Sequence, residues 1–166
     1  MSKRENKVPQ SAVGLHGFFR VAIVEGGKVV GDSGYKHNLI TSGGLTQFMT
    51  YVFAQSASSR LVTLGALGSG TALASNATIL DGSFATTLHK TLSKTFITRA
   101  ASTDGDTARY LATWVSGTST GVIANVGLYG AATAQIFCGG TFASSSVASN
   151  QAVNLTYDIC FIASTS

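Results

Sequence analysis

The end of the chain alternates regularly between apolar and polar residues. Over residues 152–162 the apolar side chains share one parity, and polar side chains occupy most of the other. The apolar set is Val153, Leu155, Tyr157, Ile159 and Phe161, and the polar set is Asn154, Thr156 and Asp158. Successive side chains of a β-strand point to opposite faces. The pattern therefore predicts a strand with one buried face and one face toward water or a partner.

Other short runs rich in β-branched and aromatic residues precede this one, separated by loops of small residues. The pair Gly26-Gly27 lies between two of them and indicates a tight hairpin, because both glycines can adopt the positive φ that such a turn needs. The runs cover residues 14–25, 28–30, 60–67, 91–100, 109–114, 122–129, 134–142 and 152–162. About eight short strands predict a mainly β fold, an antiparallel β-sandwich that resembles a jelly roll.

One segment has the spacing of a helix instead. Apolar side chains recur at i, i+3, i+4, i+7 and i+8, which is a stripe along one helical face. The stripe consists of Leu45, Phe48, Met49, Val52 and Phe53. Thr41 or Ser42 can cap the start of this helix, and the polar stretch 55–59 ends it. We expect the stripe to pack on the sandwich as part of the core.

The first residues differ from the rest of the chain. Residues 1–12 are polar and predict an extended arm, followed by a single β-sandwich domain over residues 13–166, since the whole length suits one domain. The arm carries Lys3, Arg4 and Lys7, which we expect to dock on an acidic partner surface. A solvated tail or a phosphate contact are the alternatives. The other charges are scattered singly, so nucleic acid is not an expected partner.

Charged residues make up only 11% of the chain, against roughly 25% in an ordinary soluble domain. A surface with so few charges suits a protein that neighbours cover, so we expect a homo-oligomer, most simply a trimer. The net charge is +4. The start of the chain lacks the apolar core of a signal peptide. No apolar stretch approaches the ~20 residues that span a membrane, so a membrane is not an expected partner.

Three short motifs invite a chemical interpretation. Residues 31–34 (GDSG) resemble the nucleophile loop of chymotrypsin-like serine proteases, but too little chain precedes them to supply the His and Asp partners. Residues 65–71 are Gly-rich but lack the Lys and the helix of a phosphate loop. Residues 104–106 offer two carboxylates, too few for a Ca²⁺ site. We expect no catalytic residue, cofactor or metal site, and hence no enzyme.

The two cysteines, Cys138 and Cys160, each lie in an apolar run, where Cys behaves as a small buried apolar residue. They form no metal-ligand spacing. A disulfide between them requires adjacent strands; otherwise both thiols are buried and reduced.

Three groups of strings occur in a recognisable order. They are NLITSGGL at residues 38–45, VTLG with GSGT at residues 62–71, and YLATW with IANVGLY at residues 110–129. Together they resemble small structural proteins of tailed bacteriophages, among them capsid decoration (cement) proteins and tail-collar or fibre-base proteins. The resemblance implies a virion protein without catalytic residues, assembled in the host cytoplasm. Its partners would be the major capsid protein or a tail protein.

The compact length favours a capsid decoration protein that self-associates and docks onto the particle. The alternatives are a tail-collar or fibre-base protein, or a receptor- or carbohydrate-binding virion module. A carbohydrate site needs an exposed aromatic platform, for which Tyr110 and Trp114 are candidates. Their shared parity fits the core face of a strand equally well.

Overall fold

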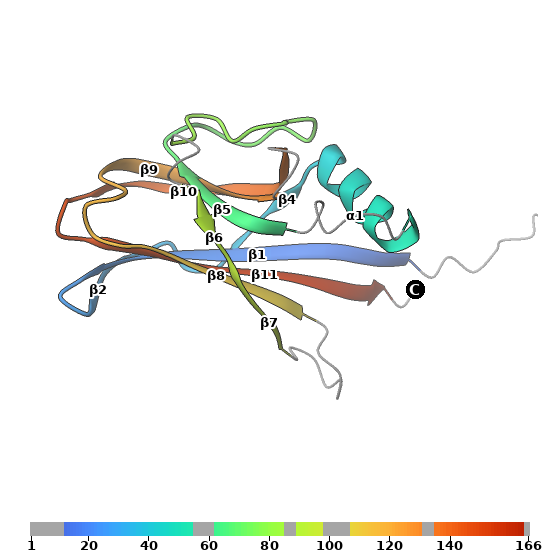
Figure 1. Ribbon diagram of the computed structural model, residues 1–166, viewed down its shortest axis with the longest axis horizontal. Coiled ribbons are helices and arrows are strands. Elements are labelled where there is room, and N and C mark those ends of the chain that lie inside the picture. Colours follow the sequence, from blue (N-terminus) through green and yellow to red (C-terminus); the bar gives the residue numbers. More distant parts are fainter. Residues whose placement is uncertain (1–11, 55–61, 85–88, 98–106, 131–134, 165–166) are drawn as a thin grey trace, which may run out of the picture.

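The computed structural model describes residues 12–54, 62–84, 89–97, 107–130 and 135–164 (Figure 1). They form two antiparallel sheets and one helix, so the predicted mainly β fold is confirmed. Sheet A has the strand order β2-β1-β11-β8-β7, with β3 also pairing with β1, and sheet B has the order β4-β10-β9-β5-β6.

The bounds of the elements are close to the expected runs. The strands of sheet A are β1 (Ala12–Glu25), β2 (Lys28–Asp32), β3 (Lys36–His37), β7 (Ser93–Ile97), β8 (Thr107–Trp114) and β11 (Ala152–Ser164). The strands of sheet B are β4 (Leu39–Ile40), β5 (Val62–Gly68), β6 (Lys90–Thr91), β9 (Gly121–Gly130) and β10 (Ile136–Val147). The helix is α1 (Ser42–Ala54).

Sheet A is built on one long ladder between the first and last long strands. Strand β1 pairs with β11 from Ala12 opposite Ser164 to Val24 opposite Ala152. The predicted hairpin follows β1, and its glycines Gly26 and Gly27 have φ values of 55° and 80°. Such a turn matches the right-handed twist of the strands that it joins. The hairpin prediction is therefore confirmed.

The chain passes from sheet A to sheet B at Asn38, between β3 and β4. The Asn38 amide nitrogen donates to the carbonyl of Gly17 at 3.0 Å. Its side-chain amide donates to the hydroxyl of Tyr157 at 2.6 Å. One residue thus holds the first strand, the last strand and the start of the second sheet together.

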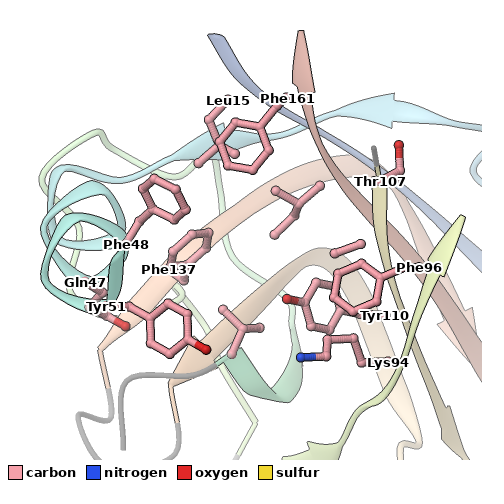
Figure 2. Close-up of a pocket in the computed structure, with 13 residues that line it drawn as sticks. Leu15, Gln47, Phe48, Tyr51, Lys94, Phe96, Thr107, Tyr110, Phe137 and Phe161 are labelled. Atoms are coloured by element: carbon pink, nitrogen blue, oxygen red, sulfur yellow. The ribbon is translucent and has the colours of Figure 1, made fainter. Parts of the chain in front are cut away.

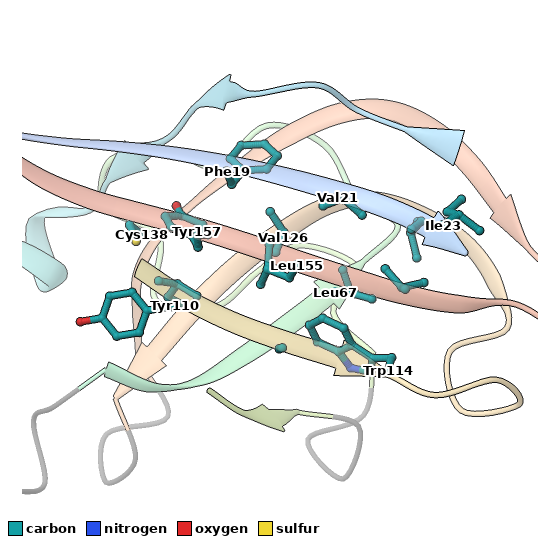
Figure 3. Close-up of a cluster of buried hydrophobic side chains, with 14 of the residues drawn as sticks. Phe19, Val21, Ile23, Leu67, Tyr110, Trp114, Val126, Cys138, Leu155 and Tyr157 are labelled. Atoms are coloured by element: carbon teal, nitrogen blue, oxygen red, sulfur yellow. The ribbon is translucent and has the colours of Figure 1, made fainter. Parts of the chain in front are cut away.

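The core lies between the sheets, as Figure 3 shows. Its largest fully buried side chains include Trp114, Tyr157 and Phe19 from sheet A, and Leu67 and Leu128 from sheet B. The apolar parity predicted for β11 is buried from Val153 to Ile159, whereas Phe161 is 47% exposed at the end of the sheet. A row of large apolar residues on each inner face is what stabilises a sandwich of this kind.

Sheet B is also covered on its outer side. Residues 69–84 fold over it and form a second, smaller core with Ala66, Leu80, Tyr129 and Ile136. The Leu80 amide donates to the Tyr129 hydroxyl at 2.6 Å, and the Asn125 side chain donates to the carbonyl of Asp81 at 2.8 Å. The Gly-rich stretch at residues 65–71 therefore runs from the end of β5 into this loop, which agrees with its interpretation as a transition from strand to loop.

The predicted helix forms, but the expected core stripe is wrong for three of its members. Leu45, Met49 and Val52 are 47%, 51% and 44% exposed, respectively. Phe48 is half-buried and packs against the main core. The side chain of Phe53 lies outside the described residues.

The start of the helix explains which face packs inward. The hydroxyl of Thr41 donates to the carbonyl of Ile136 at 2.8 Å and accepts from the Gly44 amide at 2.9 Å, which caps the helix against β10. A side chain at Gly44 would overlap the carbonyl oxygen of Phe137. This close approach points Gly44, Gln47 and Phe48 at the sheet and turns the predicted stripe about a quarter of a turn away.

Candidate functional site

A cavity of about 320 Å³ opens at the end of the sandwich where α1 faces strands β7 and β8 (Figure 2). Its walls are mainly apolar and come from both sheets and the helix. They include Leu15, Phe48, Phe137, Ile159 and Phe161. A volume near the lower end of the range for small-molecule sites, roughly 300–1,000 Å³, can hold a small ligand or one apolar side chain.

Five polar side chains also line the cavity: Gln47, Tyr51, Lys94, Thr107 and Tyr110. In Figure 2 the hydroxyls of Tyr51 and Tyr110 point into the cavity from opposite walls, and the Lys94 ammonium lies beside Tyr110. Burial raises the pKa of Tyr110 to about 12, so its hydroxyl remains a hydrogen-bond donor at neutral pH. Tyr51, Lys94 and Tyr110 therefore bring hydrogen-bond donors to an otherwise mainly apolar chamber.

Gln47 is the unusual member of this group. Its side chain is only 3% exposed, yet neither its amide nitrogen nor its amide oxygen has a hydrogen-bond partner. A buried polar group without a partner costs roughly 1–3 kcal/mol. Gln47 and Tyr51 are also one helical turn apart, so they share a face of α1.

The face of α1 beside the cavity is apolar and exposed. Leu45, Met49 and Val52 form an exposed row at i, i+4 and i+7. On a helix these positions are neighbours, so the side chains make one continuous strip. A contiguous exposed apolar strip is typical of a surface that contacts another molecule.

Among the described residues, the outer face of sheet A carries two ion pairs. Arg20 binds Asp32 near the hairpin, and Arg109 donates two hydrogen bonds of 2.8 Å to the fully buried Asp158. The hydrogen bond from Arg20 holds the pKa of Asp32 below its ordinary value. The hydrogen bond to Asp158 raises the pKa of Arg109. These groups bind one another, and their contacts are those of a structural network.

The GDSG stretch closes the hairpin. The Ser33 hydroxyl accepts from the Val21 amide at 2.9 Å and donates to the carbonyl of Gly34 at 2.8 Å. Asp32 is held by Arg20 and also accepts from the Gly34 amide at 2.9 Å. These contacts make the stretch a turn at the exit of the hairpin.

The remaining side chains that could bind a metal or take part in catalysis lie apart from one another. In the part of the chain that the structure describes, no three His, Cys, Asp or Glu side chains come together as a metal site. Asp104 and Asp106 lie outside the described residues. The ring of His37 contacts that of Phe18 in a tilted arrangement, with ring centroids 4.5 Å apart. His89 lies 5.0 Å from the ring of Tyr129, and burial lowers its pKa.

Cys138 and Cys160 form no disulfide with each other, and both thiols are buried. Cys138 lies on β10 and faces the core, whereas Cys160 lies on β11 with the outward parity of Asp158. The two strands belong to different sheets, so the condition for a disulfide is not met. Burial raises the pKa of Cys138 to about 12.

The structure places other predicted site residues as follows. Trp114 is fully buried and Tyr110 is 9% exposed, so the interpretation as core residues is confirmed and they form no exposed aromatic platform. Lys3, Arg4 and Lys7 lie outside the described residues, and their docking role stays a prediction. The described residues include no helix long and apolar enough to cross a membrane.

Comparison with family models, with curated proteins and with solved structures finds no match to this chain. The sequence reasoning also missed the cavity. Its one signal was Gln47, an amide inside an apolar helical segment, and the spacing did not show which way that amide points.

Proposed function

We propose that the chain is a non-enzymatic structural subunit of a bacteriophage virion. It self-associates, most simply as a trimer, and docks onto the major capsid protein as a decoration (cement) protein. A tail-collar or fibre-base position, on a tail protein, is the alternative location. The order of the strings at residues 38–45, 62–71 and 110–129 supports the virion assignment.

The exposed strip of α1 is the observation that carries the self-association. Leu45, Met49 and Val52 present three neighbouring large apolar side chains on a chain in which only 11% of residues are charged. Covering such a strip contributes roughly 25 cal/mol for each Å² of apolar surface removed from water. Little surrounding charge opposes the approach of a second copy.

Light scattering of the full chain at micromolar concentration tests the association. We expect an oligomer for the wild-type protein and a monomer for Met49→Lys, because an ammonium group in the middle of an apolar contact would be buried without a partner. The control is Val29→Lys on β2, which replaces another exposed apolar residue, 56% exposed, away from the helix. Equal masses for all three proteins would contradict the role of α1.

The virion assignment is tested separately. Intact particles are purified from the host culture, and their proteins are identified by mass spectrometry. We expect the chain to be present at a fixed ratio to the major capsid or tail protein. Its absence from intact particles would contradict the assignment, whatever its oligomeric state.

A further inference from the structure

The cavity beside α1 combines features that an apolar gap in a loosely packed core would not have. One wall is lined by aromatic and aliphatic side chains, among them Phe48, Phe137 and Ile159. Hydrogen-bond donors from three separate elements also line it: Tyr51 on α1, Lys94 on β7 and Tyr110 on β8. Pockets that bind small molecules are mostly apolar, with a few convergent polar groups that orient the ligand.

The charge that lines the cavity is positive. Lys94 is the one charged side chain among the described residues that line it, and no carboxylate lies among them. The Lys94 ammonium is 5.4 Å from the centre of the Phe96 ring at the mouth, which keeps it beside the opening. An anionic group entering there would meet a cation and two hydroxyl donors.

Gln47 is a second, independent sign of a ligand. It is almost fully buried, it lines the cavity, and both polar atoms of its amide lack a partner. Buried polar side chains in native proteins nearly always have a hydrogen-bond partner, and each exception calls for a cause. Both amide atoms are covered, so a ligand head group beside Tyr51 would supply that partner after the Gln47 amide turns toward the cavity.

We propose that this cavity binds a small amphiphilic carboxylate of the fatty-acid type. The carboxylate lies among Lys94, Tyr51 and Tyr110, within reach of the amide of Gln47. The hydrocarbon tail lies against Phe48, Phe137 and Ile159. The site is separate from the exposed strip of α1 and does not depend on the association of copies.

Isothermal titration of the full chain with sodium decanoate tests the proposal, with 1-decanol as the uncharged molecule of the same chain length. We expect one decanoate per chain and weaker binding of decanol. Lys94→Gln should weaken decanoate binding roughly fivefold, which corresponds to ~1 kcal/mol for an exposed charge pair. Lys28→Gln, which removes an exposed lysine of the β2 hairpin, is the matched control and should bind decanoate like the wild type.

Two further variants address the cavity itself. Ala108→Phe places a ring in the chamber from β8 and should abolish decanoate binding. Gln47→Leu removes the unpartnered amide at similar volume, so it should fold at least as stably as the wild type. It should also weaken decanoate binding at least tenfold, the loss expected for a hydrogen bond to a charged group.

Three results would overturn the proposal. The first is no measurable decanoate binding to the wild-type protein. The second is binding that Ala108→Phe and Gln47→Leu both leave unchanged. The third is an oligomer that Ala108→Phe dissociates but that decanoate does not. The cavity would then hold a side chain of a neighbouring copy, and decanoate would bind elsewhere.

Discussion

The two sheets share one core but differ in what covers their outer faces. Sheet A leaves its outer face to water and to ion pairs such as Arg109 with Asp158. Sheet B is covered on that side by residues 69–84, and its strand β9 is buried on both faces from Val126 to Gly130. A strand buried on both faces loses the simple alternation that marks a half-buried strand. The packing of sheet B therefore depends on individual contacts, whereas the packing of sheet A follows from the alternation of apolar and polar residues along its strands.

The three groups of strings at residues 38–45, 62–71 and 110–129 fall mostly on sheet B and the segments packed against it. Residues 38–45 anchor α1 to β10, residues 62–71 include β5 and the start of the covering loop, and residues 123–129 lie on β9. The polar contacts of Thr41, Asn125 and Tyr129 hold these segments together. These particular residues are needed because each satisfies a buried backbone group, which few other side chains could do.

The largest expected effect on the free energy of unfolding comes from comparing a Leu→Ala substitution on the outer face of each sheet. Leu80→Ala, in the small core over sheet B, should lower the free energy of unfolding by about 2–5 kcal/mol, because Leu80 is 1% exposed. Leu111→Ala, on the outer face of sheet A, should change it by less than about 0.5 kcal/mol, because Leu111 is 40% exposed. Urea denaturation measures both. Equal losses would show that residues 69–84 do not cover the sheet as described.

A smaller effect is expected at the hydroxyl that holds the covering loop. Tyr129→Phe leaves the buried Leu80 amide without its acceptor and should cost about 1–3 kcal/mol. Hydrogen exchange of the Leu80 amide should become faster at the same time. An unchanged exchange rate would mean that the loop is held by its apolar contacts alone.

The smallest expected effect is on how the stability of the protein depends on pH, to which His89 and the carboxylates contribute in different pH ranges. Burial lowers the pKa of His89, near β6 of sheet B, from its ordinary value of 6.5, so the folded state favours the neutral ring. As pH falls below about 6.5 the unfolded chain binds this proton more readily, and stability declines until the folded pKa is passed. The carboxylates Asp32 and Asp81 have lowered pKa values, so their contribution is lost only below about pH 4.

His89→Gln should therefore flatten the stability of the protein between pH 7 and pH 5 and leave the later acid loss unchanged. Asp32→Asn should do the reverse and reduce the loss below pH 4. Chemical denaturation at a series of pH values measures both. A decline between pH 7 and pH 5 that persists in His89→Gln would assign it to another group.

The sequence predicted the parts of the fold that repeat. The parity of Val153, Leu155 and Tyr157 identified the inner face of β11, and Gly26-Gly27 identified the first hairpin. The helix was also predicted, but its inward face was not. That face is decided by the contacts of Thr41 and Gly44 with β10, which are distant in sequence and leave no periodic signal.

The cover of sheet B and the cavity could not be predicted for the same reason. Leu80 is a single apolar residue in a loop without periodicity, and nothing local shows that it reaches Tyr129. Gln47 looked like an ordinary solvent-facing position between apolar ones. Its burial follows from how α1 is placed on the sandwich, which is a property of the assembled sheets.

The two buried thiols should react with alkylating reagents at rates that depend on how often the structure around each of them opens. Only the thiolate reacts with alkylating reagents, and the burial that raises the pKa of Cys138 to about 12 keeps this group protonated between the sheets. Modification of Cys138 must therefore wait until the sandwich opens, whereas Cys160 lies on the other side of sheet A, away from the space between the sheets, and needs only a local opening. The ratio of the two labelling rates would report how often the whole domain opens relative to its surface.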